Sequence, residues 1–429
     1  MASTYLSRSN GTPTSQQIFT FSAWVKRSKL NPSGNNMQLF SQYNDTSNRM
    51  DFRFQTGDTI DFYHTSSLGR ITTNRLFRDT SAWYHIVLRV DTTQATSSDR
   101  YRLYINGVQE TSFSTATYPS QNANLGTNFS TFSIGDDSYG SSDFDGCMTH
   151  IHYTDGQSYD ATAFGQTDAN GVWTIKTSPS VTYGTNGFFI LKDGNSVTDQ
   201  SGNGNNFTVA GGTLTNTEDN PSNVFCTVDP LTNPSVSFSN GNLTITSGDD
   251  VLSTIGVTSG KWYWEAKAIP NGTGIHYGIA GTTNSSGSGS QIYTGTNTNS
   301  SYIWLRNSDI SVRNGTGISN ANVTDNHSSV NNNDIIGTAL DLDSATKKVT
   351  FYKNGSEVGY VTFDYDNSIF IFPFFRMNSG ATSNLNFGNG YFGSTPVASA
   401  GTNASGIGIF EYDVPTGYTA LCTKGLNGE

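Results

Sequence analysis

The chain has little charge and little cysteine. Among its 429 residues only 13% are Asp, Glu, Lys or Arg, and the cysteines are Cys147, Cys226 and Cys422. They are widely spaced, and no CxxC pair is present to hold zinc or to carry redox chemistry. We therefore expect three inert thiols, which excludes the zinc-finger and thiol-redox classes of protein.

Basic residues and long apolar stretches are scarce too. The chain has 23 Lys and Arg against 34 Asp and Glu, a formal net charge of -11. A nucleic-acid partner is not expected, because a phosphate-binding surface needs clustered Lys and Arg. Membrane insertion is not expected either, since no segment approaches the roughly 20 apolar residues of a membrane span. The N-terminal MASTYLSRSNG lacks the features of a secretory signal, so we expect synthesis in the cytoplasm.

Aromatic and turn-forming residues are abundant. Aromatics make up 12% of the chain, Gly contributes 45 residues, and much of the remainder is Ser, Thr and Asn. This mixture favours short strands joined by many turns, and the spread of aromatic residues argues against disorder. The length exceeds the roughly 100 to 200 residues of an ordinary domain, so we expect two all-β domains in series.

A three-stranded unit is predicted in the first half of the chain. It begins at Trp83 and contains an Asn106-Gly107 pair. Apolar residues alternate on one face before and after a polar loop, first at Ile86, Leu88 and Val90 and then at Tyr101, Leu103 and Ile105. Asn-Gly between two alternating runs is a strong hairpin signal, because both residues tolerate the positive φ angles of a type I′ turn.

The second half repeats this plan. Alternating apolar residues from Ile336 onwards precede a polar loop, and a further run leads to Asn354-Gly355. The acidic residue that ends the first strand lies 15 positions before the turn Asn in the first copy (91 to 106) and 13 in the second (341 to 354). Two related sandwiches would produce this repeat, and the alternative is a chance match of two common hairpins.

A proline-rich stretch separates the two patterns. Pro221, Pro230 and Pro234 interrupt strand pairing between them. We expect a first sandwich over residues 1–217, a linker over 218–235 and a second sandwich over 236–429, with the C-terminal segment packing back onto it as a strand.

Both halves resemble known domain families. In the first half, FTFSAWVK, WYHIVLRVD, LYINGVQ and FDGCMTHIHYTDG resemble successive strands of laminin-G-like domains of the concanavalin type. In the second half, GKWYWEAK, HYGIAG, DIIGTALDLDSATKKVTFYKNG, FPFF and NFG resemble, in order, the landmarks of a SPRY domain. The resemblance implies an all-β protein made of two tandem concanavalin-like jelly-roll β-sandwiches.

The tandem order resembles virion proteins of the tailed bacteriophages of marine bacteria. The motifs VTYGTNGFF, DQSGNGNNFT and DNPSNVFCTVDPL add to this likeness. It implies a virion surface protein, assembled in the bacterial cytoplasm, that is tail-fibre-like and binds host surface glycans or other virion proteins. The alternative is a capsid decoration or head-fibre protein, which the lack of a coiled-coil pattern favours. The resemblance leaves a homo-oligomer open.

Catalytic residues are not expected. A glycosidase needs two carboxylates roughly 5 to 9.5 Å apart, and hydrolases of the concanavalin fold carry them as ExDxxE on one strand. None of the glutamates starts that pattern, and Glu411 and Asp413 are a close pair that we expect to be solvated. A polysaccharide depolymerase is therefore the least favoured alternative. His150 and His152 are predicted to share a strand face, without a predictable third metal ligand.

Calcium is the cofactor that the resemblance implies, because laminin-G-like domains often bind it at one rim with hard oxygen ligands. The loop GDDSYGSSDFDG supplies the candidate ligands Asp136, Asp137, Asp143 and Asp145, and DQSGNGN supplies Asp199 and Asn203. The alternative is that these side chains only cap turns.

Ligand contact is expected on loops or on a sheet face. Carbohydrate recognition combines an aromatic platform with polar hydrogen-bonding groups. The polar stretch 282–309 supplies Tyr293, Tyr302 and Arg306 as candidate ligand-binding residues. Core packing is the alternative for Tyr302 and for Trp304.

Overall fold

The computed structural model describes residues 4–428 except 31–35, 66–67, 127–128, 138–141, 193, 195, 271–273, 283–299, 308, 316 and 327. The chain folds as two compact units, Met1–Asn216 and Thr217–Glu429. Both are β-sandwiches of the jelly-roll type, which confirms the predicted fold class. Among the described residues no helix is long and apolar enough to cross a membrane.

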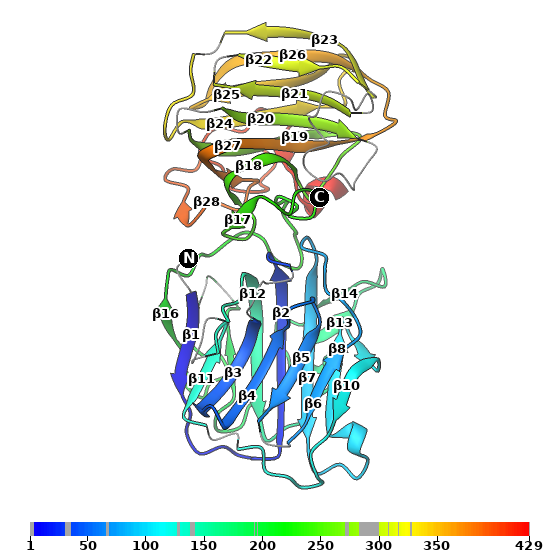
Figure 1. Ribbon diagram of the computed structural model, residues 1–429, viewed down its shortest axis with the longest axis vertical. Helices are drawn as coiled ribbons and strands as arrows, with labels where there is room; N and C mark the ends of the chain where they lie inside the picture. The colour runs from blue at the N-terminus through cyan, green and yellow to red at the C-terminus, as the bar shows by residue number, and fades with distance from the viewer. Residues whose placement is uncertain are drawn as a thin grey trace. The chain divides into compact units, whose positions relative to one another are not determined.

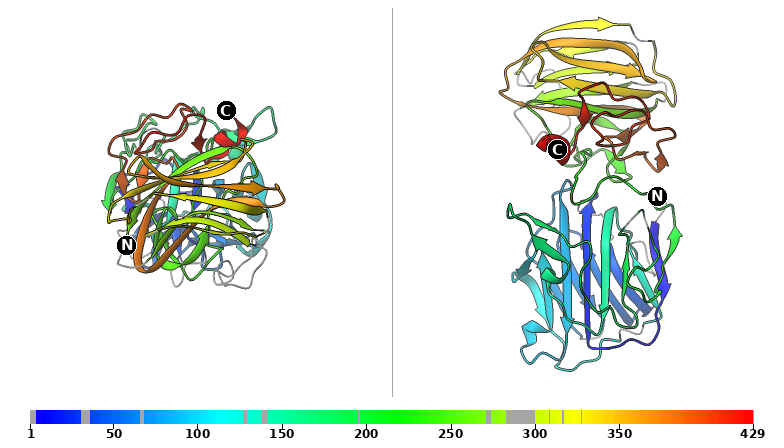
Figure 2. Two further views of the ribbon diagram at one scale, coloured as in Figure 1. Left: turned by 90° about the horizontal axis from the view of Figure 1, so that it is seen from above. Right: turned by 180° about the vertical axis from the view of Figure 1, so that it is seen from behind.

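In the N-terminal unit two sheets pack face to face (Figures 1 and 2). The front sheet has the order β10 (Phe113–Thr117), β6 (Arg70–Thr73), β5 (Ile60–His64), β4 (Asn48–Phe54), β3 (Met37–Asp45), β11 (Thr131–Ile134), β1 (Thr4–Ser9) and β16 (Thr208–Gly211). The back sheet has the order β15 (Phe188–Ile190), β12 (Gly146–Asp155), β2 (Ile18–Arg27), β7 (Trp83–Asp91), β8 (Tyr101–Ile105) and β9 (Val108–Glu110).

The outer face of the back sheet is covered by a separate segment. It contains the short helix η2 (Ala161–Ala163) and the hairpin of β13 (Gly165–Thr167) and β14 (Trp173–Ile175). Apolar side chains of this segment pack on Val87 and Tyr104 of the sheet. Both faces of the back sheet are therefore buried in this region, whereas the front sheet buries its core face.

In the C-terminal unit the strands join in one folded sheet, because the long strand β27 pairs on both sides of the sandwich. The order is β22 (Ile310–Arg313), β21 (Ser300–Arg306), β20 (Ile275–Thr282), β27 (Phe370–Asn386), β19 (Lys261–Ile269), β24 (Ile335–Asp341), β25 (Lys347–Lys353), β26 (Ser356–Tyr365) and β23 (Ile318–Asp325). Three more strands join this sheet off that path, namely β17 (Ser237–Ser239), β18 (Thr244–Leu252) and β30 (Thr419–Ala420). The remaining elements are the paired strands β28 (Tyr391–Phe392) and β29 (Thr395–Pro396) and the short helix α2 (Thr423–Asn427).

Aromatic residues from both sheets fill the N-terminal core. Phe21 of the back sheet meets Phe40 of the front sheet with ring centroids 4.7 Å apart, and Phe40 meets Phe52 at 5.7 Å. The apolar residues predicted from alternation on β7 and β8 are all buried in this core. Period-two spacing therefore located the inward face of these strands correctly.

The two Asn-Gly turns have the same geometry. The φ angles are 48° and 82° at Asn106 and Gly107, and 50° and 81° at Asn354 and Gly355, as a type I′ turn requires. Each Asn also accepts a backbone N–H through Oδ1 from the strand before its hairpin, from His85 on β7 at 2.8 Å and from Ile335 on β24 at 2.9 Å. The predicted hairpins are confirmed, and the repeat between the halves extends to side-chain hydrogen bonds.

The stretch 218–235 is not a linker, and that interpretation is wrong. Phe225, Cys226 and Val228 are buried in the C-terminal unit. Phe225 forms a β-bridge with Cys422, close to the other end of this unit. The prolines interrupt regular strands, but apolar residues between them still pack into the core.

A buried ion pair crosses the N-terminal sandwich. Arg27 and Asp58 lie 3.0 Å apart with side chains 0% and 2% exposed, and Arg78 approaches the other Asp58 oxygen at 3.1 Å. Burial lowers the pKa of Arg27, while the Asp58 charge opposes that shift. Removing one partner of such a pair leaves a buried charge uncompensated.

We expect Asp58→Asn to lower the free energy of unfolding of the N-terminal unit by about 3 kcal/mol, because Arg27 then stays buried without a counter-charge. Asn tolerates the positive φ of 68° at this position, so the change tests charge rather than backbone strain. Urea denaturation measures the loss. Arg78→Ala is the control, since the Arg78 side chain is 56% exposed and should change stability by less than about 1 kcal/mol. Equal losses in both variants would contradict the role assigned to the buried pair.

Candidate functional site

The structure describes two of the three predicted ligand residues, Tyr302 and Arg306. Tyr302 is 0% exposed and packs against Trp304 and Phe374, so its ring has no face to offer a sugar and its assignment as a ligand residue is wrong. Arg306 is partly exposed but forms an ion pair with Asp309. Tyr293 lies outside the described residues. The alternative of core packing holds for Tyr302 and Trp304.

The residues predicted to bind calcium do not form a cluster of three ligands among the residues that the structure describes. Within the described part of the chain no group of three or more His, Cys, Asp or Glu side chains is placed to hold a metal ion. Asp136 and Asp137 are buried, while Asp143 and Asp145 are partly buried, and burial raises the pKa of Asp145. These residues do not fit a calcium cage as they stand, so the calcium site stays a prediction.

Asp199 organises its loop through hydrogen bonds. Its two carboxylate oxygens accept from the backbone N–H groups of Phe189, Ser201 and Asn205 and from the Ser201 hydroxyl. Asn203 donates from Nδ2 to the carbonyl oxygens of Gly184 and Gly187. Turn capping therefore accounts for this second group of polar residues.

A serine–histidine pair exists but is set the wrong way for catalysis. Ser22 Oγ lies 2.9 Å from His85 Nε2, and the Trp173 indole N–H donates to His85 Nδ1 at 3.0 Å. Because an indole nitrogen can only donate, His85 Nδ1 carries no proton and Nε2 donates to Ser22. A nucleophilic serine needs the opposite arrangement, with the histidine accepting its proton. His85 is also fully buried, and this burial lowers its pKa to about 3.

His150 and His152 do not share a face through simple alternation. A β-bulge shifts the register of β12 between Thr149 and His152, and His150 has a φ angle of 49°. Both rings still lie against Phe189, at centroid distances of 5.7 and 3.9 Å. The pair is thus part of an aromatic cluster.

The outer face of the front sheet carries a charged network, which comes directly from alternation. On β4 and β5 the residues Phe52 and Phe62 point into the core, so their neighbours point outward. Strand register then aligns two outward rows across three strands. One row is Asp51, Tyr63 and Arg70, and the other is Arg53, Asp61 and Thr72.

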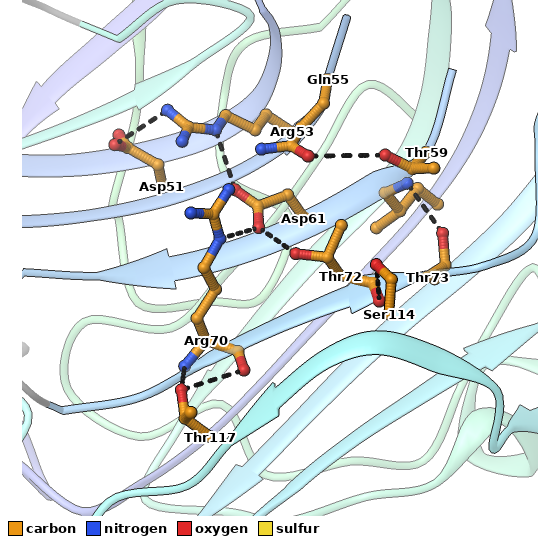
Figure 3. Close-up of polar contacts among 11 residues, drawn as sticks. Asp51, Arg53, Gln55, Thr59, Asp61, Arg70, Thr72, Thr73, Ser114 and Thr117 are labelled. Atoms are coloured by element: carbon orange, nitrogen blue, oxygen red, sulfur yellow. Dashed lines mark hydrogen bonds and ion pairs between the residues drawn. The ribbon is translucent and has the colours of Figure 1, made fainter. Parts of the chain in front are cut away.

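Asp61 is the centre of this network. It is 0% exposed, and it lies 3.1 Å from Arg53 Nε through Oδ2 and 2.7 Å from Arg70 Nε through Oδ1. Thr72 donates its hydroxyl to Oδ1 at 2.8 Å. Figure 3 shows both guanidinium groups turned toward this one carboxylate. A buried carboxylate needs such compensation, because leaving it unpaired would cost several kcal/mol.

Asp51 repeats the arrangement one strand away. Its side chain is 0% exposed, and Oδ2 lies 3.4 Å from both Arg49 Nε and Arg53 Nη1. Arg53 therefore connects the two buried carboxylates. Three arginines face two aspartates here, so the network keeps one excess positive charge.

Tyr63 stands among the three guanidinium groups. Their central carbons lie 5.8 Å (Arg49), 5.6 Å (Arg53) and 5.6 Å (Arg70) from its ring centroid, within cation–π range. The exposed fraction of the arginine side chains rises from 11% at Arg53 to 22% at Arg49 and 37% at Arg70. We call this surface, formed by Arg49, Arg53, Tyr63 and Arg70 over Asp51 and Asp61, the arginine–tyrosine face.

This face is suited to binding. Within the described residues Arg70 donates side-chain hydrogen bonds only from Nε, so its Nη groups can bind a ligand. Guanidinium groups bind carboxylate, sulfate or phosphate oxygens through paired N–H donors. This face was not predicted from the sequence. The available signal was a charged residue at alternating, outward positions, namely Arg49, Asp51 and Arg53 on β4 and Asp61 on β5.

Comparison with known families agrees with this architecture. Residues 2–157 match the model of the concanavalin A-like lectin/glucanases superfamily, and residues 261–390 match that of the SPRY domain. The chain carries a concanavalin A-like lectin domain followed by a SPRY domain. The arginine–tyrosine face lies wholly within the lectin domain. A search of curated proteins found no match.

Solved structures show weaker likenesses. The PSpry domain of TRIM65 is 17% identical with a TM-score of 0.28, and the match covers 38% of this chain and 88% of that one. Stonustoxin is 18% identical with a TM-score of 0.27, over 38% of this chain and 28% of its own. A heptameric SAP-like pentraxin from Limulus polyphemus is 16% identical with a TM-score of 0.27, over 35% and 70%. At these values the likenesses say nothing about a ligand.

We expect His85 to make the lectin domain less stable in acid. Its folded pKa of about 3 lies below the ordinary value of 6.5, so the unfolded state takes up the proton first. The stability that neutral His85 contributes is complete above pH 6.5 and is lost as the pH falls toward 3, by up to about 1.4 kcal/mol per pH unit.

The measurement is the free energy of unfolding as a function of pH for the wild type and for His85→Gln. The Gln side chain does not titrate but can still form hydrogen bonds with Ser22 and Trp173. Between pH 6.5 and 3 the free energy of unfolding of the variant should fall less steeply with decreasing pH, because one proton fewer is taken up on unfolding. Identical slopes in the two proteins would show that His85 is not held neutral.

Proposed function

We propose that this chain is a non-catalytic binding protein whose lectin domain holds a glycan on the arginine–tyrosine face. The observation that carries the proposal is that one buried carboxylate, Asp61, fixes Arg53 and Arg70 beside an aromatic ring. The family supports carbohydrate or protein binding in general. The arrangement of the face supports a ligand with hydroxyl and acidic groups.

Pre-organisation is the physical advantage of this face. A free arginine side chain loses roughly 0.5 to 1.5 kcal/mol of conformational freedom when a ligand immobilises it. The ion pairs with Asp61 already restrict Arg53 and Arg70, so much of this loss has occurred before binding. The remaining donors can then contribute to affinity and to the orientation of the ligand.

The absence of catalysis is part of the proposal. The Ser22–His85 pair is buried with the wrong proton arrangement, and the side chains of Asp51 and Asp61 are 0% exposed and paired with arginines. A glycosidase needs carboxylates that reach the glycosidic bond. Release of reducing ends from host polysaccharide by the purified protein would contradict a purely binding role.

We further propose that the protein acts on the surface of a tailed phage virion, as a tail-fibre-like component that contacts host glycans or other virion proteins. The tandem order and the connecting motifs of the sequence support this assignment. A capsid decoration or head-fibre protein is the alternative that the same fold allows. Immunogold labelling of whole virions distinguishes the two, because label on heads favours decoration and label on tails favours adhesion.

We expect Arg70→Ala to reduce the affinity for host surface polysaccharide roughly tenfold, because a hydrogen bond to a charged group contributes about 1.5 to 3 kcal/mol. Arg70→Lys should recover little of this loss, since an ammonium group cannot present paired donors. Isothermal titration and cell adsorption measure the effect.

Arg102→Ala is the matched control. Arg102 lies on the back sheet, is 29% exposed, and pairs with Asp99 at 2.8 Å, so its loss should leave binding unchanged. A glycan array and an adsorption assay that are both negative for the folded wild type would refute the glycan proposal.

A further inference from the structure

The C-terminal unit has an open depression where the β25–β26 turn meets the C-terminal segment. Its volume is about 500 Å³. The residues around it come from three short stretches, namely Asn354, Gly355 and Ser356, then Ser399, Ala400 and Gly401, and then Glu411, Tyr412 and Asp413. None of these residues belongs to the arginine–tyrosine face or to the predicted ligand loop.

A buried carboxylate holds one wall of this depression in place. Glu265 on β19 is 0% exposed, and its two oxygens accept the backbone N–H groups of Glu411 and Tyr412, each at 2.9 Å. The Tyr263 hydroxyl lies 3.2 Å from Glu265 Oε1, and Asn386 donates to the carbonyl of Ile409 at 2.9 Å. The side chains of residues 411–413 are thus presented from a fixed backbone.

Tyr412 is seated on the glycine of the turn. A Cβ atom added at Gly355 would lie 2.6 Å from Tyr412 Cδ1, so the ring contacts the turn backbone directly. The positive φ of 81° also favours glycine at this position. Among the described residues the Tyr412 hydroxyl has no hydrogen-bond partner, and it can therefore bond a ligand in the depression.

Two carboxylates flank this ring. Glu411 Oε2 accepts the backbone N–H of Ala398 at 2.8 Å, and Asp413 Oδ1 accepts from the N–H and hydroxyl of Thr402 at 2.6 and 2.8 Å. Within the described part of the chain the second oxygen of each carboxylate accepts no hydrogen bond. Each carboxylate is therefore oriented by one oxygen and can accept from a ligand with the other.

We propose that this depression binds a neutral saccharide. Ligand hydroxyl groups would donate to Glu411 and Asp413, and the apolar face of a sugar ring would pack beside Tyr412, a combination typical of carbohydrate sites. The described lining contains two carboxylates and no Lys, Arg or His, so it repels anionic ligands. Its charge is thus opposite to that of the arginine–tyrosine face, and the site stands independently of the function proposed for that face.

Saturation-transfer NMR on the full chain tests this inference with a panel of glucose, galactose, mannose and N-acetylglucosamine. The pH should be about 8, because burial raises the pKa of Glu265 to about 7 and the clamp needs its ionised carboxylate. We expect saturable binding of at least one sugar, weakened roughly tenfold by Asp413→Asn and by about fivefold by Tyr412→Ala.

Asp366→Asn is the matched control. Like Asp413, Asp366 is fully exposed and accepts a backbone N–H in a turn, here from Ser368 at 2.9 Å, but it lies outside the depression. Binding should be unchanged in this variant and in Arg70→Ala. The inference is overturned if no neutral sugar binds, if Asp413→Asn and Tyr412→Ala bind like the wild type, or if Arg70→Ala abolishes the signal.

Discussion

Buried carboxylates on the outward faces of the sheets determine which side chains and backbone segments are held in place at the surface of this protein. Each sandwich fills its core from the inward positions, so a charge buried on an outward position has to be compensated by neighbours on that same face. Asp61 is compensated by Arg53, Arg70 and Thr72. The need to neutralise one aspartate thereby fixes two arginines in a surface that can bind a ligand.

In the C-terminal unit a buried carboxylate is compensated by backbone N–H groups. Glu265 is as fully buried as Asp61, but its partners include two consecutive N–H groups of the C-terminal segment. That segment therefore stays on the sheet and brings Tyr412 to the Asn-Gly turn. One unit thus exposes a surface with excess positive charge, and the other exposes a depression lined by two carboxylates. Two sandwiches of similar construction can in this way suit different ligands.

Local patterns predicted the strands and turns but not the surfaces. Alternation over β7 and β8, and Asn106-Gly107, depend on residues close in sequence, and both predictions are confirmed. The arginine–tyrosine face depends on the register of three strands. This register places Arg53 opposite Asp61, and it cannot be predicted from the sequence of one strand alone. Residues 218–235 were misread as a linker because the β-bridge partner of Phe225, Cys422, lies almost 200 residues further along. Tyr302 was misassigned because the sequence does not show whether an aromatic side chain beside a polar loop is exposed for stacking on a sugar or buried in the core.

The central claim is that guanidinium groups tethered to Asp61 make the ligand contact. The most direct test is NMR of the arginine Nε–Hε groups during titration with host surface polysaccharide. We predict that the Arg53 and Arg70 signals are protected from exchange in the free protein and shift on binding, because both Nε atoms are bonded to Asp61. Rapid exchange of both signals before binding, or shifts confined to residues away from this face, would contradict the account.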